Sequence, residues 1–555
     1  MKIKTNKPNI LWISLEDTSP RFGCYGDSLA RTPNIDKLAG EGKTFPNAFA
    51  TAGVCAPSRS AVITGMYQTS IGTHHMRTEH TNEHTPELPT PYFAVPPPHV
   101  KTFTEYLRAE GYYCTNNFKT DYQFASPLTA WDEDGMQAHW RHREQGQPFF
   151  AVFNHILTHE SSMWGDMVRE YFHKEEKTDL PLVTDPDKVQ LPPYLPDTPK
   201  SRQSLAKYYD LIAEADEFVG KILRQLEEDG LDENTIVFLW SDHGEGLPRA
   251  KRWPYDAGIR VPLIVRWPGV MEPGQVSDQL VSLIDLGPTV LSLAGAPIPY
   301  HLEGQPFLGE QAESREYVFA TRDRYDESYD MIRAARDKRF KYIRNYYPEK
   351  PYLQWIPFSH EHPMFQELWR LKLSGQLEGD QELLMQHNRP AEELYDCEND
   401  PYEIRNLADN PDYKGELERL RTVLDAWRDK YDVWGDVPEE QMVAQMWPGG
   451  VQPQTAAPIF IPINSDLTGM IPSSKGTYRV PTAIMLHSAT QGASIAYTTD
   501  EVEKPRWKLY TGPIILNQGS TILRAKAVRI GYKDSEETTA SYNVEKTVES
   551  LSIPN

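Results

Sequence analysis

Cysteine is scarce in this chain of 555 residues, and no apolar run approaches the roughly 18 residues needed to cross a bilayer. So low a cysteine content excludes a scaffold held together by disulfides at this length. The lack of a long apolar run predicts that the chain has no membrane span. The four cysteines are Cys24, Cys55, Cys114 and Cys397.

Basic residues are also in deficit, with 57 Lys and Arg against 79 Asp and Glu and a net charge of −22. A field of that sign repels nucleic acid and anionic membranes, so we expect no nucleic-acid partner. Charged residues make up 25% and hydrophobic residues 39% of the chain, which excludes a wholly disordered protein. The length predicts more than one domain, and the 45 prolines indicate long ordered loops.

The first residues, Met1–Lys7, lack the apolar segment of a signal peptide. We therefore expect either a cytoplasmic protein, or a periplasmic or secreted one from which a signal peptide has been removed. The sequence favours neither compartment over the other.

Short apolar runs alternate with helical patterns in the first half of the chain. The segment Leu205–Leu226 repeats apolar residues at helical spacing, and Gly230 is placed to end that helix. Strands that alternate with helices predict an α/β fold, with a mostly parallel sheet sandwiched by helices. The predicted buried strands are Ile10–Leu15, Phe149–Phe153, Ile236–Trp240 and Val261–Val265.

The composition changes near residue 435. The segment 436–472 is rich in proline and glycine and predicts a linker. Short strands at regular spacing follow it and predict a small β-sandwich over residues 473–548. These strands are expected at Ala493–Tyr497, Lys508–Leu516, Thr521–Val528 and Thr538–Val544.

Two of the predicted strands lead directly into residues that can bind a metal. Glu16 and Asp17 follow the first strand, and Asp242 and His243 follow the third. The carboxyl ends of parallel strands meet at one edge of a sheet, where α/β proteins collect reactive groups. Such oxygen-rich clusters suit a hard divalent cation and accept a histidine nitrogen. Either pair alone is more often a solvated turn or a helix cap, but two pairs on one sheet favour a metal site.

The segment Cys55-Ala56-Pro57-Ser58-Arg59 carries a sharper signal. Pro57 lies in the first turn of a predicted helix, whose free N–H groups can bind an anion. Arg59 follows Cys55 by four residues, so both side chains lie on one face of that helix. A nucleophile beside a helix N-terminus and an arginine fits a site for a tetrahedral oxyanion. On the residues alone, a low-pKa thiolate is one interpretation and an inert buried cysteine is the commoner case.

The pattern Cys-x-Pro-Ser-Arg is the signature of the type I sulfatases of the alkaline phosphatase superfamily, and this chain resembles that family from Pro8 to Ala408. The resemblance implies an alkaline phosphatase-like α/β fold, with a mixed, mostly parallel sheet in 1–330 and a smaller C-terminal α+β subdomain in 331–435. Further matching segments are Gly23–Gly26, Thr32–Ala39, Ile63–Gly65, Gly258–Pro262, Glu393–Asp396, Asn399–Pro401 and Asn406–Ala408.

In that family the cysteine is converted to Cα-formylglycine (3-oxoalanine), so the resemblance implies that Cys55 is this residue. It also implies a maturation partner, either a formylglycine-generating enzyme or an anaerobic sulfatase-maturating enzyme. One hydroxyl of the hydrated aldehyde attacks sulfur, and the second then expels sulfate. The resemblance further implies one divalent cation, calcium in preference to manganese or magnesium, held by Glu16, Asp17, Asp242, His243 and the modified Cys55.

Four more residues match family positions with known roles. The resemblance implies that Arg59 orients the nucleophile and that Lys251 binds the sulfate. His159 matches the histidine that assists the leaving oxygen, and Lys119 matches the lysine of a Gly-Lys-x-His motif.

Three positions differ from the family's pattern. Glu16 stands where the family usually has Asp, and its longer arm bears on the position or identity of the metal. His243 stands where Asn is common, as in choline sulfatases and phosphonate monoester hydrolases, which slightly favours manganese or magnesium. Asp121 stands where the family has a histidine that assists collapse of the sulfated intermediate. A carboxylate can serve as that base, and His155, His74 or His75 are alternatives.

Candidate substrate contacts come from two segments and one strand end. The basic segment Arg322–Arg344, which also contains several tyrosines, predicts a surface facing a polyanion, with Arg322 and Arg324 as contacts. A sheet edge with interleaved charges is an equal expectation for it. His74 and His75 follow the Cys55 helix and, with His155, are candidates for a sugar subsite.

The tail from Ile495 to Tyr532 resembles the C-terminal domain of chitobiase and β-hexosaminidase, whose carriers act on carbohydrate. This likeness favours a sulfated polysaccharide or its oligosaccharides, of the ulvan or glycosaminoglycan kind, as substrate. The chain is also similar to N-sulfoglucosamine sulfohydrolases, so N-sulfate stands beside O-sulfate as an alternative.

A sulfatase acting on sulfated glycans is therefore the first hypothesis. A phosphonate monoester or phosphodiester hydrolase on the same fold is the second, and His243 mildly favours it. A non-catalytic glycan-binding protein is the third, and the intact set of Cys55, Arg59 and metal candidates argues against it. A thiol enzyme that uses Cys55 directly is the fourth.

Overall fold

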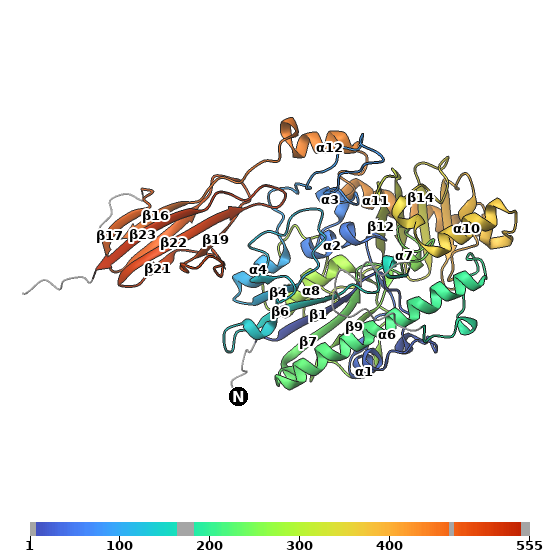
Figure 1. The fold of residues 1–555 in the computed structure, drawn as a ribbon, viewed down its shortest axis with the longest axis horizontal. Coiled ribbons are helices and arrows are strands. Elements are labelled where there is room, and N and C mark those ends of the chain that lie inside the picture. The colour runs from blue at the N-terminus through green and yellow to red at the C-terminus, as the bar shows by residue number, and fades with distance from the viewer. Residues whose placement is uncertain (1–6, 164–181, 465–470, 546–555) are drawn as a thin grey trace, which may run out of the picture.

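A mixed sheet of eight strands forms the centre of the computed structural model, which describes residues 7–163, 182–464 and 471–545 (Figure 1). Strand β9 alone runs against the other seven, which confirms the predicted mostly parallel sheet. The order is β10 (Gln275–Val276), β2 (Lys43–Thr44), β9 (Leu263–Arg266), β7 (Thr235–Ser241), β1 (Asn9–Leu15), β6 (Phe149–His155), β4 (Tyr113–Asn117) and β5 (Glu133–Asp134).

Helices cover both faces of this sheet. Leu11 and Ile13 of β1 belong to the core beneath α1 (Pro33–Glu41) and α6 (Pro199–Glu228). Their neighbours Ile10 and Trp12 point to the opposite layer, because side chains alternate along a strand. That layer contains α2 (Cys55–Thr64), α4 (Phe103–Ala109) and α8 (Leu286–Leu293).

The predicted long helix is confirmed as α6, and Gly230 lies just beyond its end with φ of +64°. The predicted strand over 261–265 is instead two strands. Pro262 separates them, since it has no N–H for the ladder. Strand β8 (Arg260–Val261) joins β3 (Ala48–Phe49) and β11 (Val281–Ser282) in a separate sheet, whereas β9 joins the central one.

A second, antiparallel sheet of four strands packs against α11 (Lys414–Tyr431). The domain boundary predicted at 330/331 falls inside this sheet, because its first two strands pair across that point. The strands are β12 (Val318–Arg322), β13 (Ile332–Arg336), β14 (Phe340–Asn345) and β15 (Glu392–Asp396).

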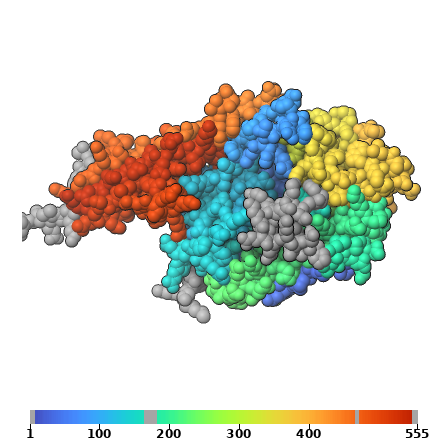
Figure 2. Space-filling view, in the orientation of Figure 1, coloured from blue at the N-terminus to red at the C-terminus, as the bar shows by residue number. Residues whose placement is uncertain are grey.

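Two further sheets form a β-module that projects from one end of the larger body (Figure 2). Their inner faces share a small core that includes Leu523, Ala525 and Tyr542. One sheet is β16 (Ile459–Asn464), β18 (Thr482–His487) and β21 (Ile514–Leu516). The other is β17 (Lys475–Arg479), β23 (Thr538–Glu545), β22 (Gly519–Val528), β19 (Ser494–Thr498) and β20 (Lys508–Leu509).

The linker predicted over 436–472 is wrong in two places. Helix α12 (Glu439–Met446) packs against the larger body, and β16 is part of the β-module. Pro462, which suggested a linker, is tolerated in β16 because this is an edge strand. The β-sandwich predicted from residue 473 therefore takes in an earlier strand.

The β-module is held to the larger body by polar contacts near α4. Lys101 Nζ donates to Gly492 O at 2.5 Å and to Ser494 Oγ at 2.7 Å. Arg108 donates to Trp507 O at 2.8 Å. Gly531, with φ of +81°, lies so close that a Cβ there would be 2.2 Å from Ala94 O. No helix in the described ranges is long and apolar enough to cross a membrane.

Candidate active site

The candidate metal ligands and Cys55 meet at one edge of the central sheet. Strands β1 and β7 are parallel neighbours whose last residues, Leu15 and Ser241, pair directly. The acidic pair after β1 and the Asp-His pair after β7 therefore emerge side by side. Cys55, the first residue of α2, lies with its Sγ 3.4 Å from His243 Nε2 and 4.0 Å from Asp17 Oδ1.

Arg59 is buried beneath this group and joins the two strand ends. Its Nη2 donates to Glu16 at 2.7 Å and its Nε to Asp242 at 3.0 Å. Its Nη1 donates at 3.1 Å to Asn154, which extends from β6. The guanidinium thus holds the carboxylates in place from behind, and its partners are these side chains rather than Cys55 itself.

Two lysines lie against the same carboxylates. Lys119 Nζ is 2.6 Å from Glu16 and 3.6 Å from Asp121. Lys251 Nζ binds both oxygens of Asp17, at 2.9 and 2.7 Å. Burial alone would raise the pKa of both carboxyl groups, but Lys119 and Arg59 hold the pKa of Glu16 below its usual value, and Lys251 does the same for Asp17.

The geometry of His243 fits a bound cation. Its Nδ1 lies 2.9 Å from Gly244 O, and since a carbonyl only accepts, Nδ1 carries a proton, which in the neutral ring leaves the lone pair on Nε2. His243 Nε2 is 3.0 Å from Asp17 Oδ1, an arrangement that a positive charge stabilises, either a proton on the ring or a bound cation. Against the effect of burial, the carboxylates of Asp242 and Asp17 raise the pKa of His243. Potential ligand atoms gather in two groups that share Cys55, one with Glu16, Asp17 and His159 and the other with Asp242 and His243. Carboxylate oxygens and imidazole nitrogens of this kind are donors suited to a divalent cation.

The Cys55 thiol is not set up as a thiolate. It is 1% exposed, and burial, together with the charge of Glu16, raises its pKa well above the usual value. The N-terminal position on α2 favours a thiolate, but burial and the charge of Glu16 outweigh it. This environment disfavours an unmodified thiol nucleophile.

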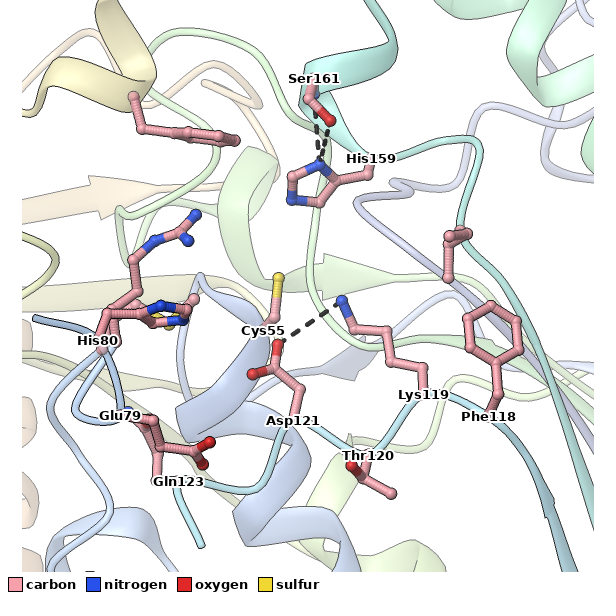
Figure 3. Close-up of a pocket in the computed structure, with 14 residues that line it drawn as sticks. Cys55, Glu79, His80, Phe118, Lys119, Thr120, Asp121, Gln123, His159 and Ser161 are labelled. Carbon is pink, nitrogen blue, oxygen red and sulfur yellow. Dashed lines mark hydrogen bonds and ion pairs between the residues drawn. The ribbon is translucent and has the colours of Figure 1, made fainter. Parts of the chain in front are cut away.

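Cys55 lies at the foot of a cavity of about 500 Å³ (Figure 3). In the close-up, His159 lies on one side of the Cys55 sulfur, and Lys119 and Asp121 lie on the other. The remaining lining residues are Met76, Arg77, Glu79, His80, Phe118, Thr120, Gln123, Ile156, Ser161 and Phe358. The structure therefore places four predicted catalytic residues, Cys55, Lys119, Asp121 and His159, in one cavity.

His159 faces the cavity with a defined tautomer. The backbone N–H of Ser161 donates to its Nδ1 at 3.3 Å, and the Ser161 hydroxyl is 2.8 Å from the same atom. Since Nδ1 accepts, the neutral ring carries its proton on Nε2. Burial and the charge of Lys251 lower the pKa of His159 to about 4.

The cavity wall holds several residues in an unusual backbone conformation. Nine non-glycine residues in the described ranges have positive φ, and four of them line this cavity. These are Arg77, Phe118, Asp121 and Gln123, with φ of 57°, 67°, 54° and 62°. Such conformations cost free energy and gather at functional sites.

The five predicted substrate contacts lie elsewhere. His74 and His75 are buried at 1% and 6% exposure, and His155 faces Phe218 of α6, with the two rings 5.1 Å apart. Arg322 is buried over the ring of Trp253. Arg324 forms a bidentate ion pair with Glu439 of α12, at 2.5 and 2.6 Å. Each of these five side chains lies in the interior and outside the lining of this cavity, so the structure does not bring them to Cys55.

The buried pair of Arg324 and Glu439 leads to a stability prediction. Replacing Glu439 with glutamine leaves a buried arginine without its counter-charge and weakens the bonds from Tyr92 and Tyr329. We expect Glu439→Gln to lower the free energy of unfolding by about 3–5 kcal/mol, measured by denaturant titration. Glu440→Gln, its exposed neighbour, is the control and should change stability little. Equal stability of the two variants would contradict this account.

The outer cavity wall was not found by sequence reasoning. Arg77, Glu79 and His80 come from the same loop as the predicted His74 and His75. Nothing in the local sequence indicates which residues of that loop face the cavity. Phe358 and Ser161 come from unrelated segments. Only the fold brings them together.

Comparisons with known proteins identify related families. The family described as sulfatase matches residues 8–296, and two smaller families match later parts of the chain. Residues 244–356 match the C-terminal region of N-sulphoglucosamine sulphohydrolase. Residues 473–540 match the chitobiase/beta-hexosaminidase C-terminal domain.

An ulvan-active sulfatase of Formosa agariphila is 42% identical to this chain, over 96% of this chain and 90% of the relative. Human N-sulphoglucosamine sulphohydrolase is 28% identical, over 79% of this chain and 94% of the relative. Among solved structures, a 2-O GAG sulfatase shares the fold, with a TM-score of 0.55 at 21% identity over 77% of this chain and 93% of that one.

Proposed function

The chain belongs to the sulfatase family, and from that premise we propose that it removes sulfate from a sulfated polysaccharide or its oligosaccharides. One observation carries the site assignment. Cys55 of the family signature lines a cavity, within reach of three carboxylates, two imidazoles and two lysines. The sulfatase activity itself follows from the family.

Glu16, Asp17, Asp242 and His243 are proposed to hold one divalent cation. Their oxygen-rich set favours calcium, and the imidazole also admits manganese or magnesium. When bound, the cation polarises the sulfate oxygens, and the formylglycine that a maturation enzyme makes from Cys55 supplies the nucleophilic oxygen.

Lys119 and Lys251 place two positive charges beside the position of Cys55. In this account both bind sulfate oxygens and stabilise the charge that develops on them, as fixed cations do in a water-poor site. Arg59 keeps Glu16 and Asp242 at fixed separation and so acts as a positioning residue. The role of Lys251 is the one that the family resemblance implies, whereas the resemblance gave Lys119 a motif position without a role and had Arg59 orient the nucleophile directly.

His159 and Asp121 are proposed to handle protons on opposite sides of the reacting group. The Nε2 proton of His159 forms a hydrogen bond to the leaving oxygen. Asp121 is an acceptor 3.6 Å from Lys119 and takes a proton where the family has a histidine.

The substrate class is inferred from the relatives and the β-module. The relative at 42% identity is named for activity on ulvan, and the β-module matches a domain carried by carbohydrate-active enzymes. We therefore propose an ulvan-like polysaccharide first and a glycosaminoglycan-like one second.

The test is a comparison of initial rates on ulvan oligosaccharides, glycosaminoglycan oligosaccharides, N-sulfoglucosamine, an aryl sulfate and an aryl phosphodiester. We expect the highest kcat/KM on a sulfated oligosaccharide. His243 matches the residue of phosphonate monoester hydrolases, so hydrolysis of a phosphonate monoester or phosphodiester is the alternative. A higher kcat/KM on the phosphodiester than on every sulfate ester would favour that alternative and contradict the proposal.

A further inference from the structure

One wall of the cavity carries a cationic side chain, Arg77, which lies against the ring of Phe358. Arg77 lies in the loop after α3 (Gln68–Ile71), and Phe358 lies in the short helix α9 (Pro357–His360). The centre of the Arg77 guanidinium is 4.6 Å from the centroid of the Phe358 ring. Both side chains line the same cavity as Cys55. Two segments far apart in sequence thus fix one planar cation at the cavity wall.

Asp326 anchors this arginine from behind. It forms an ion pair with Arg77 Nε and lies 3.5 Å from Arg252, which is held in turn by Glu160. Arg77, Arg252 and Asp326 all have positive φ, of 57°, 76° and 51°. A backbone held in this way at three contacting residues indicates that the position of the guanidinium is set by function rather than by local preference.

The outer edge of the Arg77 guanidinium is available to a ligand. Its side chain is 31% exposed, unlike the fully buried Arg324. Within the described ranges, the ion pair of this side chain is formed by Nε, with Asp326. Because Nε faces Asp326, the Nη atoms remain as the polar edge of a side chain that lines the cavity.

Arg77 differs from Lys119, the other lysine or arginine in the cavity lining, in its distance from the reacting centre. Lys119 is engaged with Glu16 at the reacting centre. The lining also holds two acidic residues, Asp121, which repels an anion, and Glu79, whose pKa burial raises to about 7. Arg77 therefore offers a second negative charge of the substrate a permanently charged partner on this wall.

We propose that Arg77 is a specificity-determining residue that binds a second anionic oxygen group, a carboxylate or another sulfate, next to the scissile sulfate. The proposal rests on the proposed function. A planar guanidinium binds such groups through two parallel hydrogen bonds, and the Phe358 ring restricts it to one plane. The same ring offers an apolar face to a sugar.

Two matched pairs of substrates test this proposal. The first pair is uronate-bearing ulvan oligosaccharides before and after chemical reduction of the carboxylates to alcohols. The second pair is a disulfated and a monosulfated form of one uncharged sugar. We expect the wild-type enzyme to prefer the more anionic member of at least one pair by about tenfold in kcat/KM, which equals about 1.4 kcal/mol. The pair that shows the preference identifies the carboxylate or the sulfate as the group bound.

In Arg77→Gln this preference should disappear, and Arg77→Lys should retain part of it, since lysine keeps the charge but not the planar fork. Arg141→Gln, which removes a surface arginine paired with Asp229, is the control and should keep the wild-type ratio. The ratio of two substrates on one enzyme is independent of the fraction folded.

Equal ratios in wild type and Arg77→Gln, in an enzyme that hydrolyses these sugars, would overturn the role of Arg77 alone. A wild-type enzyme that hydrolyses 4-nitrophenyl sulfate but none of the sugars would overturn both this proposal and the proposed substrate class.

Discussion

Replacing Cys55 with serine, in a host whose maturation enzyme modifies only cysteine, is expected to abolish sulfate ester hydrolysis. Cys55 is the residue at which the candidate ligands and the cavity converge. Without the aldehyde, no group at this position can both attack sulfur and release sulfate. We expect kcat/KM on an aryl sulfate to fall by about 10⁴-fold or more, as for the loss of other catalytic nucleophiles.

A matched control separates this effect from the general loss of a thiol. Cys24 lies outside the cavity lining and is only half-buried. Cys24→Ser should retain wild-type activity, and alkylation of exposed thiols in the mature enzyme should leave activity unchanged. Wild-type-like activity of Cys55→Ser would remove the formylglycine mechanism, whereas inactivation by alkylation at Cys55 would favour the thiol enzyme.

Removing the carboxylate of Asp17 is expected to have the second largest effect. Asp17 contacts Lys251 through both oxygens, accepts from the backbone N–H of Glu160 at 2.7 Å, and faces His243 Nε2. Asp17→Asn should reduce bound divalent metal, measured by elemental analysis, from about one ion per chain to near zero. Activity should fall by about 10³-fold or more.

A second acidic cluster provides the control. Asp256, Glu403 and Cys397 also lie close enough to share an ion, but Lys341 Nζ occupies their centre, 2.5 Å from Asp256 and 2.7 Å from Glu403. This internal cation makes a metal unnecessary there. Glu403→Gln should therefore leave the metal content unchanged. Full metal content in Asp17→Asn, or full activity after prolonged incubation with excess chelator, would contradict the four-ligand assignment.

The core of the site was predictable because it depends on local sequence and on one topological rule. Glu16 and Asp242 follow apolar strands, and parallel strands bring their carboxyl ends together. Cys55 and Arg59 belong to one short motif on one helix. Each of these relations extends over a few residues or over neighbouring strands, so the pattern alone locates the groups.

The cavity wall and the buried arginines were not predictable in the same way. A basic segment with several tyrosines reads as a surface, yet Arg324 finds its counter-charge in Glu439, over a hundred residues later, and Arg333 finds Asp323 and Asp432. Whether such a side chain is buried depends on partners that no local pattern reveals. The positions of Arg77 and Phe358 depend on the same long-range packing.

The measurement that tests the central claim most directly is the mass of the proteolytic peptide containing Cys55, from protein made in a host with a maturation enzyme. The account predicts a loss of about 18 Da relative to the unmodified peptide, the change from cysteine to formylglycine. An unmodified Cys55 in active enzyme from such a host would contradict the proposed nucleophile.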